Sequence, residues 1–282
     1  EVFRHRERLD QLTPRATAGK VAGAVGTGAG FGPHAAEVED SVMQRLGLTA
    51  EEAPTQVVGR DRLAEFTNLL ALIAGTAERL STELRNLQRT EIGELSEAFD
   101  ENRQVGSSTM AQKRNPVVAE NITSLARLIR AFALPPLENM ALWHERDLSN
   151  SANERVVVPH VVVLTDDVLT KLTDLFHRVT VHPDRMEANL SMSDGAVMTE
   201  NAVLRLTERG MPRAEAHELL RKLTREEVGG PGLPERVAAD PTIQQYLQPA
   251  EIAQLFRPES YVEAAGRKTD RIVARIAPLL DR

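Results

Sequence analysis

A polar segment with the sequence GSSTMAQKRNP spans residues 106–116 and collects groups that could bind and deprotonate an anionic substrate. Ser107 and Ser108 offer hydroxyls beside a glycine, and Lys113 offers a cation six residues after Ser107. A serine can act as a general base only as its alkoxide, which needs nearby positive charge and dipoles. Lys113 and the N-terminus of a following helix could supply them. On composition alone, an ordinary Gly-Ser turn with Lys113 and Arg114 as solvated charges fits equally well.

A second polar segment, WHERDLSNSANER over residues 143–155, carries two guanidinium groups and a hydroxyl within a short span. Arg146, Ser151 and Arg155 could bind phosphate or carboxylate, because the planar arginine fork matches the geometry of these oxyanions. The competing interpretation is a salt-bridged surface in which the arginines pair with the three acidic residues of the same segment. Taken alone, the segment favours this second interpretation.

Other polar segments carry weaker signals. Gln56, in TQVVGRDRLAEF over residues 55–66, could read a base edge through its amide, although a polar residue at a helix start is the simpler interpretation. The glycines of residues 19–32 do not predict a dinucleotide site, because no strand precedes them and no βαβ unit is visible. The seven histidines show no metal-binding spacing such as HExxH. Cysteine is absent, which excludes thiolate metal sites, disulfides and a cysteine nucleophile.

Long helices are the elements that must position these groups. Apolar residues from Phe66 to Leu87 are spaced 4, 3, 4, 3, 4 and 3 apart, a heptad stripe over roughly six helical turns. The same spacing runs from Val118 to Phe132. Asn115 is a good N-cap and Pro116 a good first helical residue, so we expect the second helix to begin directly after the polar loop.

The stretch VVVPHVVVLTDDVL, residues 156–169, is ambiguous between strand and helix. Its β-branched run favours a buried strand, whereas Val161, Leu164 and Val168 fall at helical spacing. We interpret it as a helix kinked at its proline, because no other convincing strand exists to pair with it. With a break near Val181, the sequence predicts an all-α fold: a helical-bundle domain over residues 1–181 and a smaller C-terminal helical domain over residues 182–282.

The composition and charge of the chain limit the classes of partner that it can be expected to bind. The 282 residues are 41% hydrophobic and 27% charged, as in an ordinary globular protein, and only 4% aromatic, which suits packed aliphatic helices. A net charge of −7 argues against non-specific binding to nucleic acid. No apolar run reaches the ~18 residues that a membrane-spanning helix needs, and the first ten residues do not resemble a signal peptide. We therefore expect neither nucleic acid nor a membrane as a partner.

The segment GSSTMAQKRNP resembles the signature loop of the fumarase/aspartase superfamily, GSSxMPxKxNP. Three further segments, GKVAGAVGT, TQVVGRDR and LWHERDLSNSANER, resemble the adenylosuccinate lyases within it, and the resemblance runs from about Arg4 to Leu223. It implies a long-helix bundle of the fumarase/aspartase type, assembled as a homotetramer with active sites shared between chains. It also implies a small-molecule nucleotide substrate, a cytoplasmic location, and no metal or other cofactor.

The resemblance also implies a role for each polar group. Ser107 would remove the proton next to a carboxylate in a β-elimination that releases fumarate from adenylosuccinate, leaving AMP, or from the succinylated aminoimidazole carboxamide ribotide. Lys113 and Asn115 would hold the carboxylate on which charge develops. Supporting positions in and after the loop are Ser108, Met110 and Glu120. The nucleotide and its phosphate would be held by Gln56, Arg146, Ser151 and Arg155.

The sequence departs from the family pattern in two respects. Ala111 and Gln112 replace the usual proline and the common histidine of the loop, and the alanine should loosen it. The GRTHG-type motif that carries the family's general-acid histidine does not occur, so we expect the chain to correspond to the family without its N-terminal portion. Alternatives are a 3-carboxy-cis,cis-muconate cycloisomerase, whose loop is also close, an argininosuccinate lyase, and a non-catalytic helical scaffold.

Overall fold

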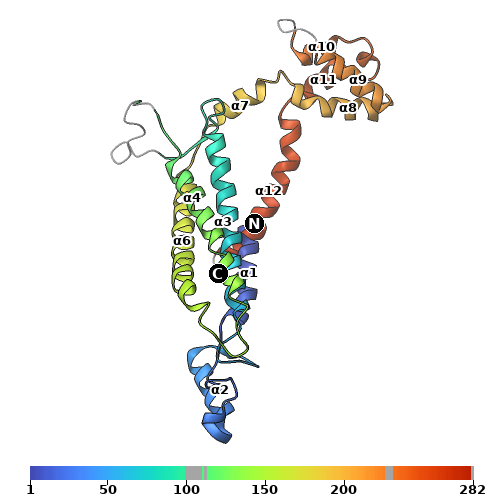
Figure 1. Cartoon of the computed structure of the whole chain (residues 1–282). Coiled ribbons are helices and arrows are strands. Elements are labelled where there is room, and N and C mark those ends of the chain that lie inside the picture. The colour runs from blue at the N-terminus through green and yellow to red at the C-terminus, as the bar shows by residue number, and fades with distance from the viewer. Residues whose placement is uncertain (99–109, 111–112, 226–230, 281–282) are drawn as a thin grey trace. The chain divides into compact units, whose positions relative to one another are not determined.

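The computed structural model describes residues 1–98, 110, 113–225 and 231–280 (Figure 1). Ser107, Ser108, Ala111 and Gln112 lie outside these residues. The described residues are predominantly helical, and their strands are two-residue pieces, so the predicted all-α fold is confirmed. The chain divides into two compact units, Glu1–His182 and Pro183–Arg282.

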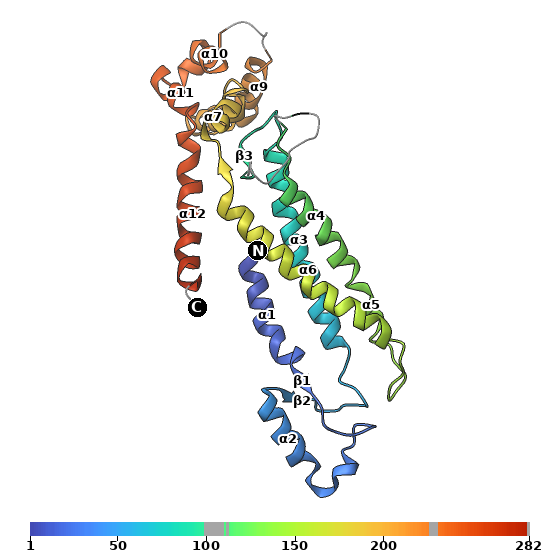
Figure 2. The ribbon, with the colours of Figure 1, turned by 90° about the vertical axis from the view of Figure 1, so that its left-hand side faces the viewer.

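The first unit is built around three long helices that run side by side (Figures 1 and 2). The unit also contains two short strand pairs: β1 pairs with β2 in parallel, and β3 pairs with β4 antiparallel. Its elements, in chain order, are α1 (Val2–Ala16), β1 (Ala18–Gly19), η1 (Ala29–His34), α2 (Ala35–Leu46), β2 (Thr49–Ala50), α3 (Asp61–Leu87), β3 (Leu95–Ser96), α4 (Val117–Ala131), α5 (Leu134–Glu138), α6 (Ser151–Arg178) and β4 (Thr180–Val181).

Helices α3, α4 and α6 pack on one another through the predicted apolar stripes. Small residues such as Ala74, Ala119 and Ala126 are fully buried, which lets the helix axes approach closely. Larger aliphatic side chains such as Ile122 fill the remaining space, so a core almost without aromatic residues is closed. The ambiguous β-branched stretch lies inside α6, which continues through Pro159, and its interpretation as a helix is confirmed.

Apolar side chains also remain exposed along α6. Val162, Leu169 and Phe176 are 42%, 40% and 46% exposed and follow one another at heptad spacing, with Val163, 65% exposed, beside them. We call these four residues the outer stripe of α6. None of the described helices combines the length and the apolar character required to cross a lipid bilayer.

The second unit has its own apolar core, which includes Leu206, Leu220, Leu233 and Ile252. The hydroxyl of Tyr261 donates to the Met198 carbonyl at 2.8 Å and accepts from the Asn201 backbone N–H at 3.2 Å, which fastens the start of the last helix to that core. The elements of this unit are α7 (Pro183–Ser191), η2 (Ala196–Met198), α8 (Thr199–Glu208), α9 (Arg213–Leu223), α10 (Leu233–Ala239), η3 (Ile243–Gln245), α11 (Pro249–Leu255) and α12 (Glu259–Leu280).

Candidate active site

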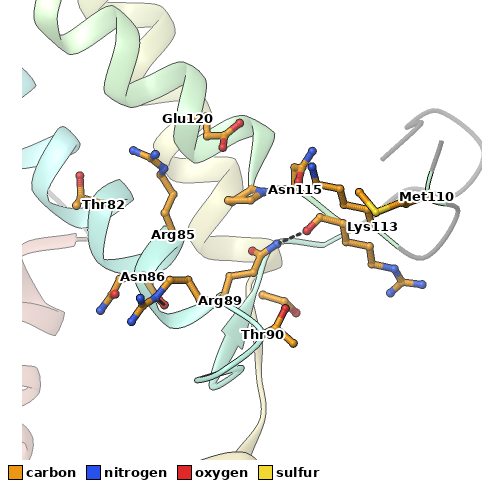
Figure 3. Close-up of a pocket in the computed structure, with 13 residues that line it drawn as sticks. Thr82, Arg85, Asn86, Arg89, Thr90, Met110, Lys113, Asn115 and Glu120 are labelled. Atoms are coloured by element: carbon orange, nitrogen blue, oxygen red, sulfur yellow. Dashed lines mark hydrogen bonds between the residues drawn. The ribbon is translucent and has the colours of Figure 1, made fainter. Parts of the chain in front are cut away.

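A polar groove of about 810 Å³ opens where α3 ends and α4 begins, and we call it the loop groove (Figure 3). Its lining includes Arg85 and Asn86 of α3, Arg89 just after that helix, Met110, Lys113 and Asn115 of the segment before α4, and Glu120 of α4. The described part of the polar loop therefore shares one groove with Glu120, as the predicted grouping requires. Ser107 and Ser108 lie outside the described residues.

Lys113 is a cation of the loop groove that is available to bind an anion. Its side chain is exposed, and only its backbone N–H takes part in a hydrogen bond, to the Met110 carbonyl at 3.1 Å. Within residues 1–98 and the other described ranges, its ammonium group has no ion-pair or hydrogen-bond partner. A cation in this state can bind a carboxylate without first breaking an internal contact.

The start of α4 differs from the prediction. The helix begins at Val117, and Pro116 rather than Asn115 occupies the N-cap position. The carboxylate of Glu97, just after β3, takes over the capping role: it accepts hydrogen bonds from the backbone N–H groups of Val118 at 3.2 Å and Ala119 at 2.7 Å. An acceptor from outside the helix thus satisfies the donors that a capping asparagine would have satisfied.

This cap changes the electrostatics of the groove. Glu97 is only 9% exposed, and burial raises the pKa of its carboxyl, while the two N–H donors act in the opposite direction. The buried carboxylate therefore already uses two of the N–H groups that this helix N-terminus could offer to an anion in the loop. The cationic side chains in the lining of the loop groove are those of Arg85, Arg89, Lys113 and Arg114.

A second groove, of about 570 Å³, lies where α3 and α6 begin, and we call it the arginine groove. Arg60, the N-cap of α3, and Leu63 of α3 line it together with Arg146, Ser151 and Arg155, so the structure brings the three predicted oxyanion-binding residues together. Arg146 and Arg155 are exposed, and neither guanidinium contacts a carboxylate within the described chain. The interpretation of this segment as a salt-bridged surface is therefore wrong for these two arginines.

Gln56 lies on the segment that leads into α3, beside this groove. Its backbone N–H donates to the Glu145 carbonyl at 3.3 Å, and its own carbonyl accepts from the Lys20 ammonium at 3.0 Å. The glycine-rich segment packs against the same region: Gly26 has φ +77°, and a Cβ there would lie 1.9 Å from the Pro54 carbonyl oxygen. The glycine thus permits a close backbone contact that helps to hold the Gln56 segment in place.

A network of half-buried polar groups fixes the first turn of α6. Glu154 forms a bidentate ion pair with Arg60, and the side chains of Glu154 and Arg60 are only 15% and 21% exposed. Asn139 and Asn153 exchange amide hydrogen bonds of 2.6 and 2.9 Å beside this pair. Because Ser151 and Arg155 lie among the first five residues of α6, the network holds the backbone that carries them.

Replacing Glu154 with alanine is expected to destabilise the protein by about 1–3 kcal/mol, because Arg60 would lose its carboxylate while keeping little contact with water. Denaturant unfolding would measure the loss. Glu65→Ala is the matched control, because Glu65 pairs with Arg15 at a surface where both side chains are about half exposed. That change should cost no more than ~0.5–1 kcal/mol. Equal losses for the two variants would contradict a stabilising role for the Arg60–Glu154 pair.

The two grooves lie at opposite ends of the same helix. Arg60 precedes the first residue of α3, whereas Arg85 and Arg89 lie at its end. At 1.5 Å per residue, the 27 residues of α3 extend about 40 Å. Figures 1 and 2 show the starts of α4 and α6 at opposite ends of the bundle. A single chain therefore does not bring Lys113 and Arg155 to one ligand.

Sequence reasoning missed several residues of these grooves. Arg85 and Arg89 are four residues apart at the end of a predicted helix, a spacing that could have indicated a shared cationic face. Glu97 gave no such signal, because its partners lie 21 and 22 residues further along the chain. Arg60 and Glu154 are 94 residues apart in the sequence, so their pairing could not be predicted from it either.

Comparisons with known proteins give a consistent result. Residues 1–130 match the family model described as Lyase, and residues 195–272 match the one described as Adenylosuccinate lyase C-terminus. Over 274 residues, 97% of this chain, the sequence is 40% identical to the adenylosuccinate lyase of Methanothermobacter thermautotrophicus and 42% identical to that of Pyrococcus abyssi. The chain spans 61% and 60% of the lengths of these two relatives.

Similar solved structures support the same fold. The 3-carboxy-cis,cis-muconate lactonizing enzyme from Pseudomonas putida matches with a TM-score of 0.85 at 30% identity, over 96% of this chain and 60% of its own. A fumarate lyase from Mesorhizobium sp. BNC1 matches with a TM-score of 0.84 at 28% identity, over the same shares of the two chains.

Proposed function

We propose, from the similarity of this chain to adenylosuccinate lyases, that it belongs to their family and serves a lyase that releases fumarate from adenylosuccinate, leaving AMP, and from the succinylated aminoimidazole carboxamide ribotide. The observation that carries the proposal is the 40–42% identity to adenylosuccinate lyases over 97% of the chain. The two grooves support it, because one offers cations suited to a dicarboxylate and the other offers cations suited to a phosphate.

In the proposed reaction, the loop groove binds the succinyl part of the substrate. Ser107 removes the proton from the carbon next to a carboxylate, and negative charge then spreads onto that carboxylate. Lys113 and Asn115 bind it there, where a preorganised cation lowers the barrier more than water does. The electron pair on that carbon then forms the double bond of fumarate, the carbon–nitrogen bond breaks, and the nitrogen keeps the bonding pair and takes up a proton from a general acid to become the amino group of the product. Met110, Ser108 and Glu120 support the loop during these steps.

The arginine groove binds the nucleotide part. Arg146 and Arg155 carry guanidinium groups without an internal carboxylate partner, and the Ser151 hydroxyl lies beside them, which together suit a phosphate. Gln56, on the neighbouring segment, contacts the base or the succinyl group. Since about 40 Å separates the grooves within one chain, the loop groove of one subunit and the arginine groove of another serve the same substrate molecule.

Assembly into a homotetramer supplies that arrangement. The outer stripe of α6 is a long, exposed apolar surface with heptad spacing, which is typical of helices that pack against a second copy. We place this enzyme of nucleotide synthesis in the cytoplasm.

The wild-type protein is expected to run as a tetramer in light scattering at micromolar concentration, and Val163→Glu is expected to yield smaller species. Val163 is 65% exposed in one chain, so a charge there leaves the subunit core intact but cannot be buried at an interface without a partner. Lys222→Glu, an exposed charge reversal outside the outer stripe, should leave the tetramer unchanged. A monomeric wild-type protein would contradict both the tetramer and the shared sites.

A fumarate-release assay tests the reaction itself. The natural full-length protein is supplied with adenylosuccinate, argininosuccinate and 3-carboxymuconate in parallel, and the loss of 3-carboxymuconate is measured directly, because its cycloisomerisation releases no fumarate. Turnover of adenylosuccinate, with little or none of the other two compounds, is the expected result. Preferential turnover of argininosuccinate, or no turnover of any substrate, would contradict the proposal.

Cycloisomerisation of a carboxymuconate is the second candidate, favoured by the TM-score of 0.85 to the Pseudomonas putida enzyme. The arginine groove weighs against it, because a carboxymuconate has no phosphate to bind there. AMP binding separates the two: an enzyme for adenylosuccinate must bind this product, whereas an enzyme for a carboxymuconate has no need to.

A further inference from the structure

Both ends of the polar loop are joined to each other through two side chains outside the predicted site. The chain enters the loop after β3, at Glu97, and leaves it through Lys113, Arg114 and Asn115 into α4. Gln88, directly after α3, bridges the two sides: its amide oxygen accepts from the Glu97 backbone N–H at 2.9 Å, and its amide nitrogen donates to the Arg114 carbonyl at 3.2 Å.

The second tie is the Glu97 carboxylate. It binds the N–H groups of Val118 and Ala119, as described above, and Gln88 holds the backbone of this same residue. Gln88 and Glu97 therefore form a clasp that fixes residues 114–119 against the end of α3. We call it the loop clasp.

The Glu97 side of the clasp is buried or half-buried, whereas the hydrogen bond from Gln88 to the Arg114 carbonyl lies at the surface. Ala119 is fully buried, and Glu97 nearly so. A small cleft beside Glu97 is lined by Lys171, Asp174 and Arg178, but the Lys171 ammonium donates to Asp167 and Asn121 instead. The Glu97 carboxylate thus binds backbone N–H groups, and these hydrogen bonds hold the start of α4 in one position.

The position that the clasp fixes is that of Lys113 and Asn115. These two residues flank Arg114, whose carbonyl Gln88 holds, and both line the loop groove. We infer that Gln88 and Glu97 are positioning residues for the fumarate end of the site: they hold Lys113 and Asn115 where these residues meet a dicarboxylate. The inference rests on the proposed function, since it takes that pair as the carboxylate-binding groups.

Glu97→Leu, Glu97→Gln and Gln88→Ala test the clasp in the full-length protein. A displacement of about 1 Å in a positioned group can cost on the order of 100-fold, so Glu97→Leu and Gln88→Ala are expected to weaken fumarate binding by calorimetry, and to lower kcat, at least ~10-fold. Glu97→Gln should fall between wild type and Glu97→Leu, because the amide keeps one of the two carbonyl-type acceptors. AMP affinity should stay within about twofold of wild type, because the AMP site is the arginine groove at the far end of α3.

Hydrogen exchange gives a readout that does not depend on activity. The amide protons of Val118 and Ala119 should exchange faster in Glu97→Leu than in wild type, while those in the middle of α4 keep their protection. Glu83→Gln is the control, because it removes an exposed carboxylate from α3 without touching the clasp. If Glu97→Leu does not fold, Gln88→Ala, which removes only an amide from a partly exposed residue, still decides the outcome.

The outcomes separate the two proposals. A wild-type protein that binds fumarate but releases none from adenylosuccinate would contradict the proposed function. Fumarate affinity and amide hydrogen exchange in the variants would then still test the clasp. Unchanged fumarate affinity in both Gln88→Ala and Glu97→Leu would overturn the clasp. A parallel loss of AMP affinity and of thermal stability would also overturn it, because the residues would then maintain the fold in general rather than position Lys113 and Asn115.

Discussion

Replacing Ser107 with alanine is expected to lower the turnover of adenylosuccinate at least ~100-fold while leaving substrate affinity and thermal stability nearly unchanged. The proton to be removed lies beside a carboxylate and is weakly acidic, so without a positioned base the barrier to the carbanion remains high. The change deletes a single hydroxyl and adds no bulk, so its effect on stability should stay within ~0.5 kcal/mol. Steady-state kinetics and a thermal melt on the full-length protein measure both quantities.

Ser108→Ala is the matched control for this experiment, because it removes the same group from the next residue. If Ser107→Ala keeps more than a tenth of wild-type turnover and Ser108→Ala abolishes it, the proton transfer belongs to Ser108. If neither change affects an otherwise active enzyme, the loop does not supply the base.

Replacing Arg155 with alanine is expected to weaken AMP binding about 10- to 100-fold, measured by calorimetry. The lost contact is a charge-assisted hydrogen bond to phosphate, worth about 1.5–3 kcal/mol. Folding should be nearly unaffected, because the guanidinium is exposed and has no ion-pair partner among the described residues.

Arg178→Ala provides the control for the arginine groove. Arg178 is an exposed arginine on the same helix, α6, but it ends that helix, whereas Arg155 lies in its first turns. Its removal should leave AMP affinity unchanged. Equal AMP affinity in wild type and Arg155→Ala would mean that the arginine groove does not bind the phosphate.

The helical framework could be predicted because its causes are local. The 4-3 spacing between Phe66 and Leu87 falls within α3, and the stripe from Val118 to Phe132 falls within α4 and its C-cap. The choice of helix for the β-branched stretch around Pro159 was correct for a topological reason: a strand there would have needed a partner strand, and the sequence offered none.

The fine structure of the site could not be predicted, because its causes are contacts between distant residues. Asn115 has the right chemistry for an N-cap, yet Glu97 reaches the helix start from 21 residues away and displaces that role. The acidic residues around Arg146 and Arg155 suggested salt bridges by proximity in sequence. Glu154 instead turns inward to Arg60, which leaves both arginines to face the groove.

The separation of the two grooves along α3 also has a genetic consequence. If each working site combines the loop groove of one subunit with the arginine groove of another, a chain defective in Ser107 still contributes a sound arginine groove, and a chain defective in Arg155 still contributes a sound loop. Two alleles that are each inactive alone would then restore part of the activity when they are expressed in the same cell. Two alleles damaged in the same groove would not restore activity. The pattern of complementation would therefore show at which end of α3 each mutated residue lies.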